Sequence, residues 1–176
     1  MCIRDSYLWE SLNDPIVANL DDIDLPEVDD ERVEGIIRIR NAWTGQYLSA
    51  TSDLPQEEVD TYADEPTYWS QQWEVEPTSN PDIVRLRCRW THPNYASNYL
   101  HGTGTVTANS SPIEASPSLN NNERQEWELE QVEGNTYRIR NVFKNRYLNA
   151  DQDGTVTNYD YNESWYSQRW MIESVE

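Results

Sequence analysis

The sequence is poor in the residues that build disulfides, zinc sites and basic surfaces. It has two cysteines, two histidines and a single lysine, Lys144. One cysteine lies in the first six residues, MCIRDS, which resemble the translation of a sequencing adapter and which we expect to be an artefact. Cys88 is then the only credible cysteine, which excludes an intrachain disulfide framework. No Cys or His pair has the spacing of a zinc site.

The balance of charge excludes other classes of partner. Arg and Lys total 13 against 32 Asp and Glu, which gives a net charge of −19 at pH 7. Such a chain repels phosphate backbones and anionic membrane surfaces, so we expect no nucleic-acid partner. No apolar run approaches the length of a membrane span, so we also expect no membrane insertion. An acidic, solvated surface fits a secreted protein, and we expect an extracellular location.

Catalytic and metal-binding motifs are also missing. There is no nucleophile elbow, no glycine-rich phosphate loop and no Cys/His nucleophile pattern. The run NADQDGTVTNYD begins like a calcium loop, but its twelfth position is Asp160 instead of Glu, and its flanks alternate like strands. A glycosidase carboxylate pair can hide among so many acids, which leaves a small hydrolase as the least favoured alternative. We therefore predict no catalytic residue, no metal site and no cofactor.

Aromatic residues are abundant but unusual in kind. The chain has eight Trp and eleven Tyr against one Phe. Trp and Tyr combine an apolar body with a polar group, which suits half-exposed surfaces and polar ligands as well as a core.

Residues 1–34 differ in composition from the rest of the chain. They contain eleven acidic residues and two arginines, few aromatics and no sustained hydrophobic period. This pattern is typical of a solvated acidic linker, or of the remnant of an upstream domain. A short acidic interaction motif is the alternative. We expect the chain to be part of a larger multidomain protein.

From Gly35 onward the sequence repeats itself three times. The copies open with GIIRIRNAW, DIVRLRCRW and NTYRIRNVF, and continue with QYLSA, NYLHG and RYLNA. Each copy closes with a Q-x-W segment that begins at Gln71, Gln125 or Gln168, and an apolar residue lies twelve positions before each of these glutamines. The copies therefore span about 35–80, 81–132 and 133–176.

Inside each copy the hydrophobic period is two. Segments such as RIR and WEVE alternate apolar with charged residues, which indicates half-buried strands, and turn-forming residues separate them. We predict four strands per copy, near 36–40, 46–49, 59–62 and 72–76 in the first. One copy cannot bury its apolar face alone, whereas three copies that close around a pseudo-threefold axis can.

Three copies of this length, each ending in Q-x-W, resemble the ricin B-chain-like lectins. The resemblance covers residues 35–176 and implies a β-trefoil of three pseudo-symmetric repeats of four strands. The finer W-S-Q-x-W and RIRN pattern is similar to carbohydrate-binding modules of secreted bacterial enzymes and adhesins. The resemblance implies a module that binds oligo- or polysaccharide without chemistry and tethers a missing partner domain to it. A structural or protein-interaction β-trefoil is the alternative.

The resemblance also implies a shallow sugar site in each copy. Such a site has a polar residue after the second strand, an aromatic on or after the third, and a polar residue beside the Q-x-W glutamine. In the third copy these positions and the nearby aromatics are Asn149, Tyr159, Trp165, Tyr166, Ser167 and Gln168. In the first copy they are Ser49, Tyr62, Tyr68, Trp69, Ser70 and Gln71. In the middle copy the equivalent residues are His101, Ser116, Arg124 and Gln125, and no aromatic stands at the stacking position. We therefore predict that this copy does not bind sugar or has an altered site.

One departure from the family bears on specificity. The acid that holds galactose in the best-known members is replaced by Ser49, His101 and Asn149, so the resemblance does not imply a galactose preference.

Residues that recur in all three copies are expected in the core, whereas residues that do not recur are candidates for a binding site. The tryptophans that recur in Q-x-W are predicted core residues, and Trp43, Trp90 and Phe143, which also recur in character, are predicted to form a core or cap layer. Tyr62 and Tyr159 do not recur in the middle copy, which favours a role in binding.

Overall fold

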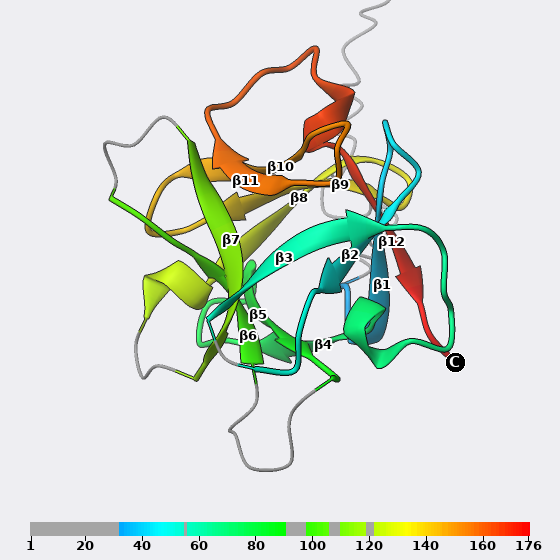
Figure 1. The fold of residues 1–176 in the computed structure, drawn as a ribbon. Helices are drawn as coiled ribbons and strands as arrows, with labels where there is room; N and C mark the ends of the chain where they lie inside the picture. Colours follow the sequence, from blue (N-terminus) through cyan, green and yellow to red (C-terminus); the bar gives the residue numbers. More distant parts are fainter. Residues whose placement is uncertain (1–31, 55, 91–97, 106–109, 119–121) are drawn as a thin grey trace, which may run out of the picture. The chain divides into compact units, whose positions relative to one another are not determined.

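The computed structural model describes residues 32–54, 56–90, 98–105, 110–118 and 122–176 (Figure 1). The predictions of an adapter artefact at residues 1–6 and of an acidic linker lie outside the described residues, apart from residues 32–34, which precede the first strand.

The described residues form strands and short 3-10 helices. The strands of the first third are β1 (Gly35–Asn41), β2 (Tyr47–Ala50), β3 (Glu57–Tyr62) and β4 (Trp73–Pro77). They continue with β5 (Ile83–Cys88), β6 (Asn98–Gly102), β7 (Ser110–Pro117) and β8 (Trp127–Glu133). The last are β9 (Thr136–Asn141), β10 (Arg146–Ala150), β11 (Val156–Tyr159) and β12 (Trp170–Ser174). The 3-10 helices are η2 (Trp69–Gln71), η3 (Glu123–Gln125) and η4 (Tyr166–Gln168). The prediction of an all-β chain is confirmed, and no helix in the described part is long and apolar enough to cross a membrane.

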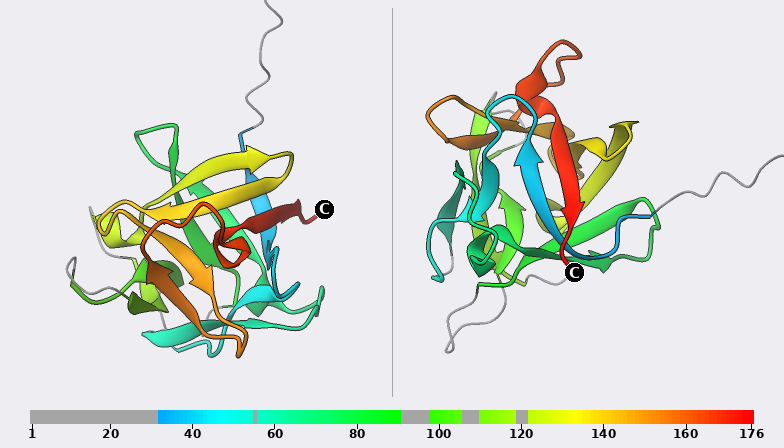
Figure 2. Two further views of the ribbon diagram at one scale, coloured as in Figure 1. Left: turned by 90° about the horizontal axis from the view of Figure 1, so that it is seen from above. Right: turned by 90° about the vertical axis from the view of Figure 1, so that its right-hand side faces the viewer.

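Six of the strands pair in a closed antiparallel ring. β1 pairs with β4, β4 with β5, β5 with β8, β8 with β9, β9 with β12, and β12 again with β1. Figure 2 shows the closing pair, β1 in blue and β12 in red, side by side. The other strands form three hairpins, β2–β3, β6–β7 and β10–β11, in which β7 also pairs with β3 and β11. Closure leaves the ring without free strand edges.

The Q-x-W tryptophans fill the core, as predicted. All three have no exposed surface: Trp73, Trp127 and Trp170. Each donates its indole N–H to a leucine carbonyl at 2.9–3.1 Å, the acceptors being Leu48, Leu100 and Leu148. The indole therefore fills the core and also satisfies a buried carbonyl, which a smaller aromatic without a donor does not do.

The Q-x-W glutamines hold loops in place. Gln71, Gln125 and Gln168 are buried, and each donates its amide N–H to a backbone carbonyl eight residues earlier in the chain. In Gln168 the side-chain oxygen also accepts the N–H of Asn162 at 2.9 Å. A buried amide must find partners, and here they are carbonyls at or just after the end of the strand that precedes each 3-10 helix.

Arginine and tyrosine side chains join successive parts of the chain through shared glutamates. The second arginine of each R-x-R segment and the tyrosine of each YL segment contact the same carboxylate, that of the glutamate three residues after a Q-x-W tryptophan. The three sets are Arg87 and Tyr99 on Glu76, Arg140 and Tyr147 on Glu130, and Arg40 and Tyr47 on Glu173. Burial, and then the hydrogen bond to the glutamate, raises the pKa of each of these tyrosines. The last set ties β12 to the beginning of the ring.

The segment that begins like a calcium loop is a hairpin turn between β10 and β11. Gly154 adopts a φ of +99°, and a Cβ there would lie 3.0 Å from the carbonyl oxygen of Thr61, so glycine is required. The Gly154 carbonyl accepts the Thr61 N–H at 2.7 Å, which joins this turn to β3. Within the described residues no group of three or more His, Cys, Asp or Glu side chains is arranged to hold a metal ion.

Candidate functional site

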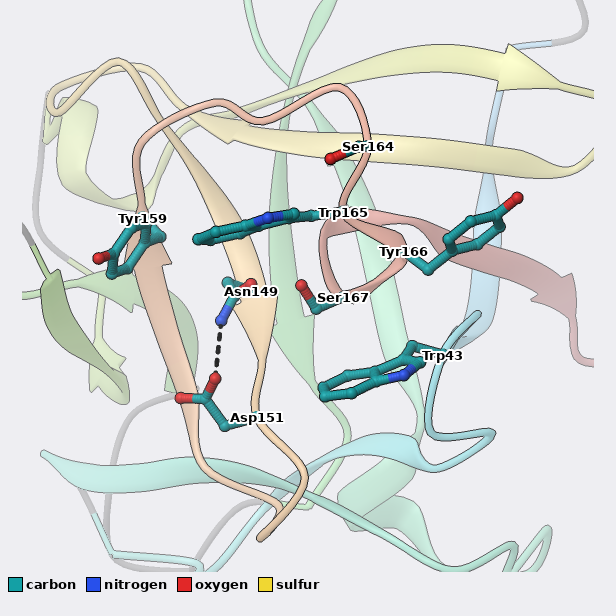
Figure 3. Close-up of a pocket in the computed structure, with 8 residues that line it drawn as sticks. All are labelled: Trp43, Asn149, Asp151, Tyr159, Ser164, Trp165, Tyr166 and Ser167. Carbon is teal, nitrogen blue, oxygen red and sulfur yellow. Dashed lines mark hydrogen bonds between the residues drawn. The ribbon is translucent and has the colours of Figure 1, made fainter.

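A cavity of about 510 Å³ lies beside η4, between the β10–β11 hairpin and the turn after β1 (Figure 3). Five of the six residues predicted for the third copy line it. The lining residues are Trp43, Asn149, Asp151, Tyr159, Ser164, Trp165, Tyr166 and Ser167. Gln168 is fully buried and bonds to the loop backbone, so it supports the wall of the cavity and does not line it.

Asn149 places a polar group at the back of this cavity. Its side chain is 3% exposed, and its amide nitrogen donates to an Asp151 carboxylate oxygen at 3.3 Å. Its amide oxygen is buried and has no hydrogen-bond partner among the residues that the structure describes. Buried polar atoms are nearly always hydrogen-bonded, so an unpartnered amide oxygen that faces a cavity indicates a place for a ligand's donor group.

Exposed aromatic rings form the sides of the cavity. The rings of Tyr159 and Trp165 pack against each other, with centroids 5.3 Å apart and planes tilted by 45°. Tyr166 is exposed, but the guanidinium of Arg169 lies 4.4 Å from the centre of its ring and covers one face. Within the predicted pair, Trp165 is therefore the better placed to contact a ligand.

Trp43 forms a further wall, and its prediction as a core or cap residue was wrong. Its side chain is 47% exposed and lines the cavity from the turn that follows β1. Its recurrence with Trp90 and Phe143 suggested a shared structural position, because core residues must recur in every copy. The structure shows instead that an aromatic which recurs in the sequence can border a cavity.

Asn41 fixes the turn that carries Trp43. This buried side chain accepts the N–H groups of Trp43 and Thr44 at 3.1 Å, and its amide nitrogen donates to the Ser167 carbonyl at 2.9 Å. This one side chain therefore holds the turn that carries Trp43 against η4. Its partner in η4, Ser167, lies 126 residues after Asn41 in the sequence. The sequence contains the asparagine in the RIRN segment, but its partner becomes visible only in the structure.

The six residues predicted for the first copy lie on two adjacent cavities of about 430 Å³ each. The predicted residues on one are Ser49, Tyr62, Tyr68, Ser70 and Gln71. Those on the other are Tyr68, Trp69 and Ser70. Trp90 borders both cavities and also packs partly against the core. It takes the place that Trp43 has beside the cavity next to η4, which we call the third-copy cavity.

The polar groups of the first copy are more fully paired than those of the third. The hydroxyls of Ser49 and Ser70 lie 3.1 Å apart and bond to each other. The guanidinium of Arg89 lies 5.4 Å from the centre of the Trp69 ring. The third-copy cavity, with its unpartnered Asn149 oxygen, therefore has the stronger case for a ligand.

Cations occupy the corresponding place in the middle copy. The guanidinium of Arg124 lies 4.1 Å from the centre of the Phe143 ring and donates to the Gly104 carbonyl at 2.6 Å. Burial, followed by the charges of Arg124 and Lys144, lowers the pKa of His101. The middle copy thus has charged groups where the other two have exposed aromatics.

Cys88 takes the place in the RLRC segment of the sequence that Asn41 and Asn141 have in the two RIRN segments. It is fully buried, and its Sγ makes weak contacts with the Trp69 and Ser70 carbonyls, at 3.8 and 3.9 Å. Burial raises the pKa of the thiol to about 12. In a Cys2→Ser variant we expect no reaction with a thiol reagent at pH 8 in the native state and one reactive thiol after unfolding in urea. Labelling of the native protein at the rate of the unfolded one would contradict the buried position.

The sequence of this chain is similar to one known protein family. The family model for ricin-type beta-trefoil lectin domain-like proteins matches residues 71–165 and 123–176. No curated protein sequence matches that of this chain.

Solved structures show the same fold at low sequence identity. The designed threefold-symmetric protein ThreeFoil aligns with a TM-score of 0.69 at 17% identity, over 81% of this chain and 100% of that one. A Polyporus squamosus lectin, solved with a human-type influenza-binding epitope, gives 0.65 at 18% identity over 79% of this chain and 48% of its own. An exo-beta-1,3-galactanase from Clostridium thermocellum gives 0.69 at 13% identity, over 80% of this chain and 30% of its own. The chain thus spans about half of the Polyporus lectin and less of the galactanase. The fold is β-trefoil-like.

Proposed function

Because the chain belongs to the family of ricin-type β-trefoil lectin-like domains, we propose that it binds an oligo- or polysaccharide in the third-copy cavity. The observation that carries the proposal is the unpartnered amide oxygen of Asn149, buried at the back of a cavity with exposed aromatic walls. The family supports carbohydrate binding in general, and the lining of this cavity supports the proposal that binding occurs there.

The chemistry of the cavity suits a sugar ring. A pyranose presents a C–H face and a rim of hydroxyls, so its site needs an aromatic plane and a few fixed polar groups. Trp165 and Tyr159 supply the planes, and Asn149 supplies an acceptor for a hydroxyl. The hydroxyl of Ser167, which also lines the cavity, can donate or accept beside it.

We infer that the domain, residues 35–176, is built of three repeats of four strands. Three recurring contacts support this: the indole bond to a leucine carbonyl, the glutamine bond to a loop carbonyl, and the glutamate shared by an arginine and a tyrosine. The first two occur once within each predicted copy, and the third occurs once between each copy and the next.

The proposed role is binding without catalysis. We propose that the domain is secreted and tethers a partner domain of a larger chain to a glycan. The first-copy cavities supply a second, weaker site, and two sites on one polymer raise avidity without any new contact. Each site alone is expected to be weak, because shallow polar sites gain little after desolvation.

The proposal is tested by measuring binding of the full chain to a panel of soluble polysaccharides. We expect at least one polysaccharide to bind, and Trp165→Ala or Asn149→Ala to weaken binding at the third-copy cavity by on the order of tenfold. Ser116→Ala is the matched control, because Ser116 is the middle-copy equivalent of Tyr159, and it should leave binding unchanged.

Two results would count against this function. Retention of a protein from an extract without binding of any glycan would favour the protein-interaction alternative. Release of reducing sugar from a polysaccharide by the purified chain would contradict the absence of catalysis.

A further inference from the structure

Trp43 and Trp165 face the third-copy cavity from two sides. Both line it, and Figure 3 shows them on opposite sides of Ser167. From this geometry we infer that the cavity is a two-walled slot, selective for a neutral pyranose whose ring substituents are all equatorial, of gluco or xylo configuration. This inference rests on the proposed function and adds the class of sugar.

The two walls come from parts of the chain that are far apart but firmly joined. Trp165 precedes η4 as its N-terminal flanking residue, and Trp43 lies in the turn after β1. The Ala42 N–H donates to the Arg169 carbonyl at 2.9 Å, and the Asn41 amide nitrogen donates to the Ser167 carbonyl at the same distance. Because these bonds join the two segments on either side of the slot, the backbone that carries each wall is held in place before a ligand arrives.

Pre-positioned walls favour binding, because less ordering is needed when the ligand enters. A mobile turn would lose backbone freedom on contact with the ligand, which subtracts from affinity. Here the backbone of the Trp43 turn is held by a side chain with no exposed surface. Both indoles are nevertheless partly exposed, at 47% for Trp43 and 37% for Trp165, so their faces remain available.

Two aromatic walls discriminate between sugar configurations. An aromatic plane attracts a sugar through the C–H groups of one ring face. When all ring substituents are equatorial, C–H groups point to both faces, so both indoles can be contacted. An axial hydroxyl, as in galactose or mannose, would point at one of the walls and lose its hydrogen bonds to water without a replacement.

The charge around the slot favours a neutral sugar. The Asp151 carboxylate lines the cavity and accepts a hydrogen bond from Asn149, and the chain carries a net charge of −19. A sialic or uronic acid would bring a further negative charge next to this carboxylate. The unpartnered amide oxygen of Asn149 can accept a hydrogen bond from an uncharged hydroxyl.

The inference is tested by calorimetric titration of the full chain in a Tyr68→Ala background, which removes the exposed aromatic shared by the two first-copy cavities. The probes are cello-, xylo-, galacto- and manno-oligosaccharides of equal length. We expect the cello- or xylo-oligosaccharide to bind on the order of tenfold more tightly than the other two. Trp43→Ala should reduce the preferred affinity by a similar factor, and Trp43→Phe should keep most of it.

The control is Phe143→Ala, which removes the corresponding aromatic of the middle copy and should leave affinity unchanged. If Trp165→Ala abolishes binding while Trp43→Ala does not, the slot is wrong and the proposed function stands. Tighter binding of the galacto- or manno-oligosaccharide would likewise overturn the inference alone. Failure of every saccharide to bind would overturn the proposed function and the slot with it.

Discussion

Replacing Trp170 with alanine is expected to lower the free energy of unfolding by about 3–5 kcal/mol. The indole has no exposed surface, so its removal leaves a large cavity in the core. It also leaves the Leu148 carbonyl, which accepts the indole N–H at 2.9 Å, without that partner. A domain of this kind has about 5–15 kcal/mol of stability in total, so the loss is a large share of it. Urea unfolding followed by tryptophan fluorescence measures the change.

Two companion variants keep this prediction testable if the alanine variant does not fold. Trp170→Phe retains much of the packing and loses the hydrogen bond, so we expect an intermediate loss of about 1–3 kcal/mol. Trp69→Ala removes an indole that is 59% exposed, and its effect should stay below about 1 kcal/mol. Equal losses at Trp69 and Trp170 would show that burial does not set the difference.

Asn41→Ala is expected to reduce both stability and ligand binding. The buried amide makes bonds to the backbone of Trp43, Thr44 and Ser167, and alanine replaces none of them. We expect a loss of about 2–4 kcal/mol in the free energy of unfolding. Saccharide affinity at the third-copy cavity should also fall, because the turn that carries Trp43 is no longer held against η4. Denaturation and titration of the same protein measure the two effects separately.

A variant in the middle copy serves as a matched control for Asn41→Ala. Cys88 occupies the same position, but its thiol makes only contacts of 3.8 and 3.9 Å with backbone carbonyls. Cys88→Ala should therefore cost less than half as much as Asn41→Ala, and it should leave the third-copy cavity intact. If Asn41→Ala lowered stability but left affinity unchanged at a temperature where the protein is folded, Asn41 would have no role in positioning Trp43.

Much of the fold could be predicted from the sequence because its signals are local and repeated. The period of two and the turn residues located the strands of the first copy to within a few residues, and burial of the Q-x-W tryptophans followed from their recurrence. The closing of β12 against β1 was expected from the exposed edges of a single copy.

The candidate site was predictable only in part. The sequence placed Asn149, Tyr159 and Trp165 together, because they lie within one copy and near one Q-x-W segment. It missed Trp43, because this residue reaches the cavity through a long-range hydrogen bond from Asn41. Recurrence alone does not distinguish a core tryptophan, whose N–H bonds to a buried carbonyl, from one that forms a cavity wall.

The join between Asn41 and Ser167 has a consequence for the order of folding. The third-copy cavity combines a turn near the start of the ring with η4, directly before β12, so it is complete only when β12 has paired with β1. Contacts of such long sequence separation form late, because closing a long loop costs chain entropy before any contact compensates for it. During synthesis, the cavity cannot exist until almost the whole domain has been made. Saccharide binding would therefore report ring closure, and a chain cut before β12 would lack the cavity even if its earlier hairpins had formed.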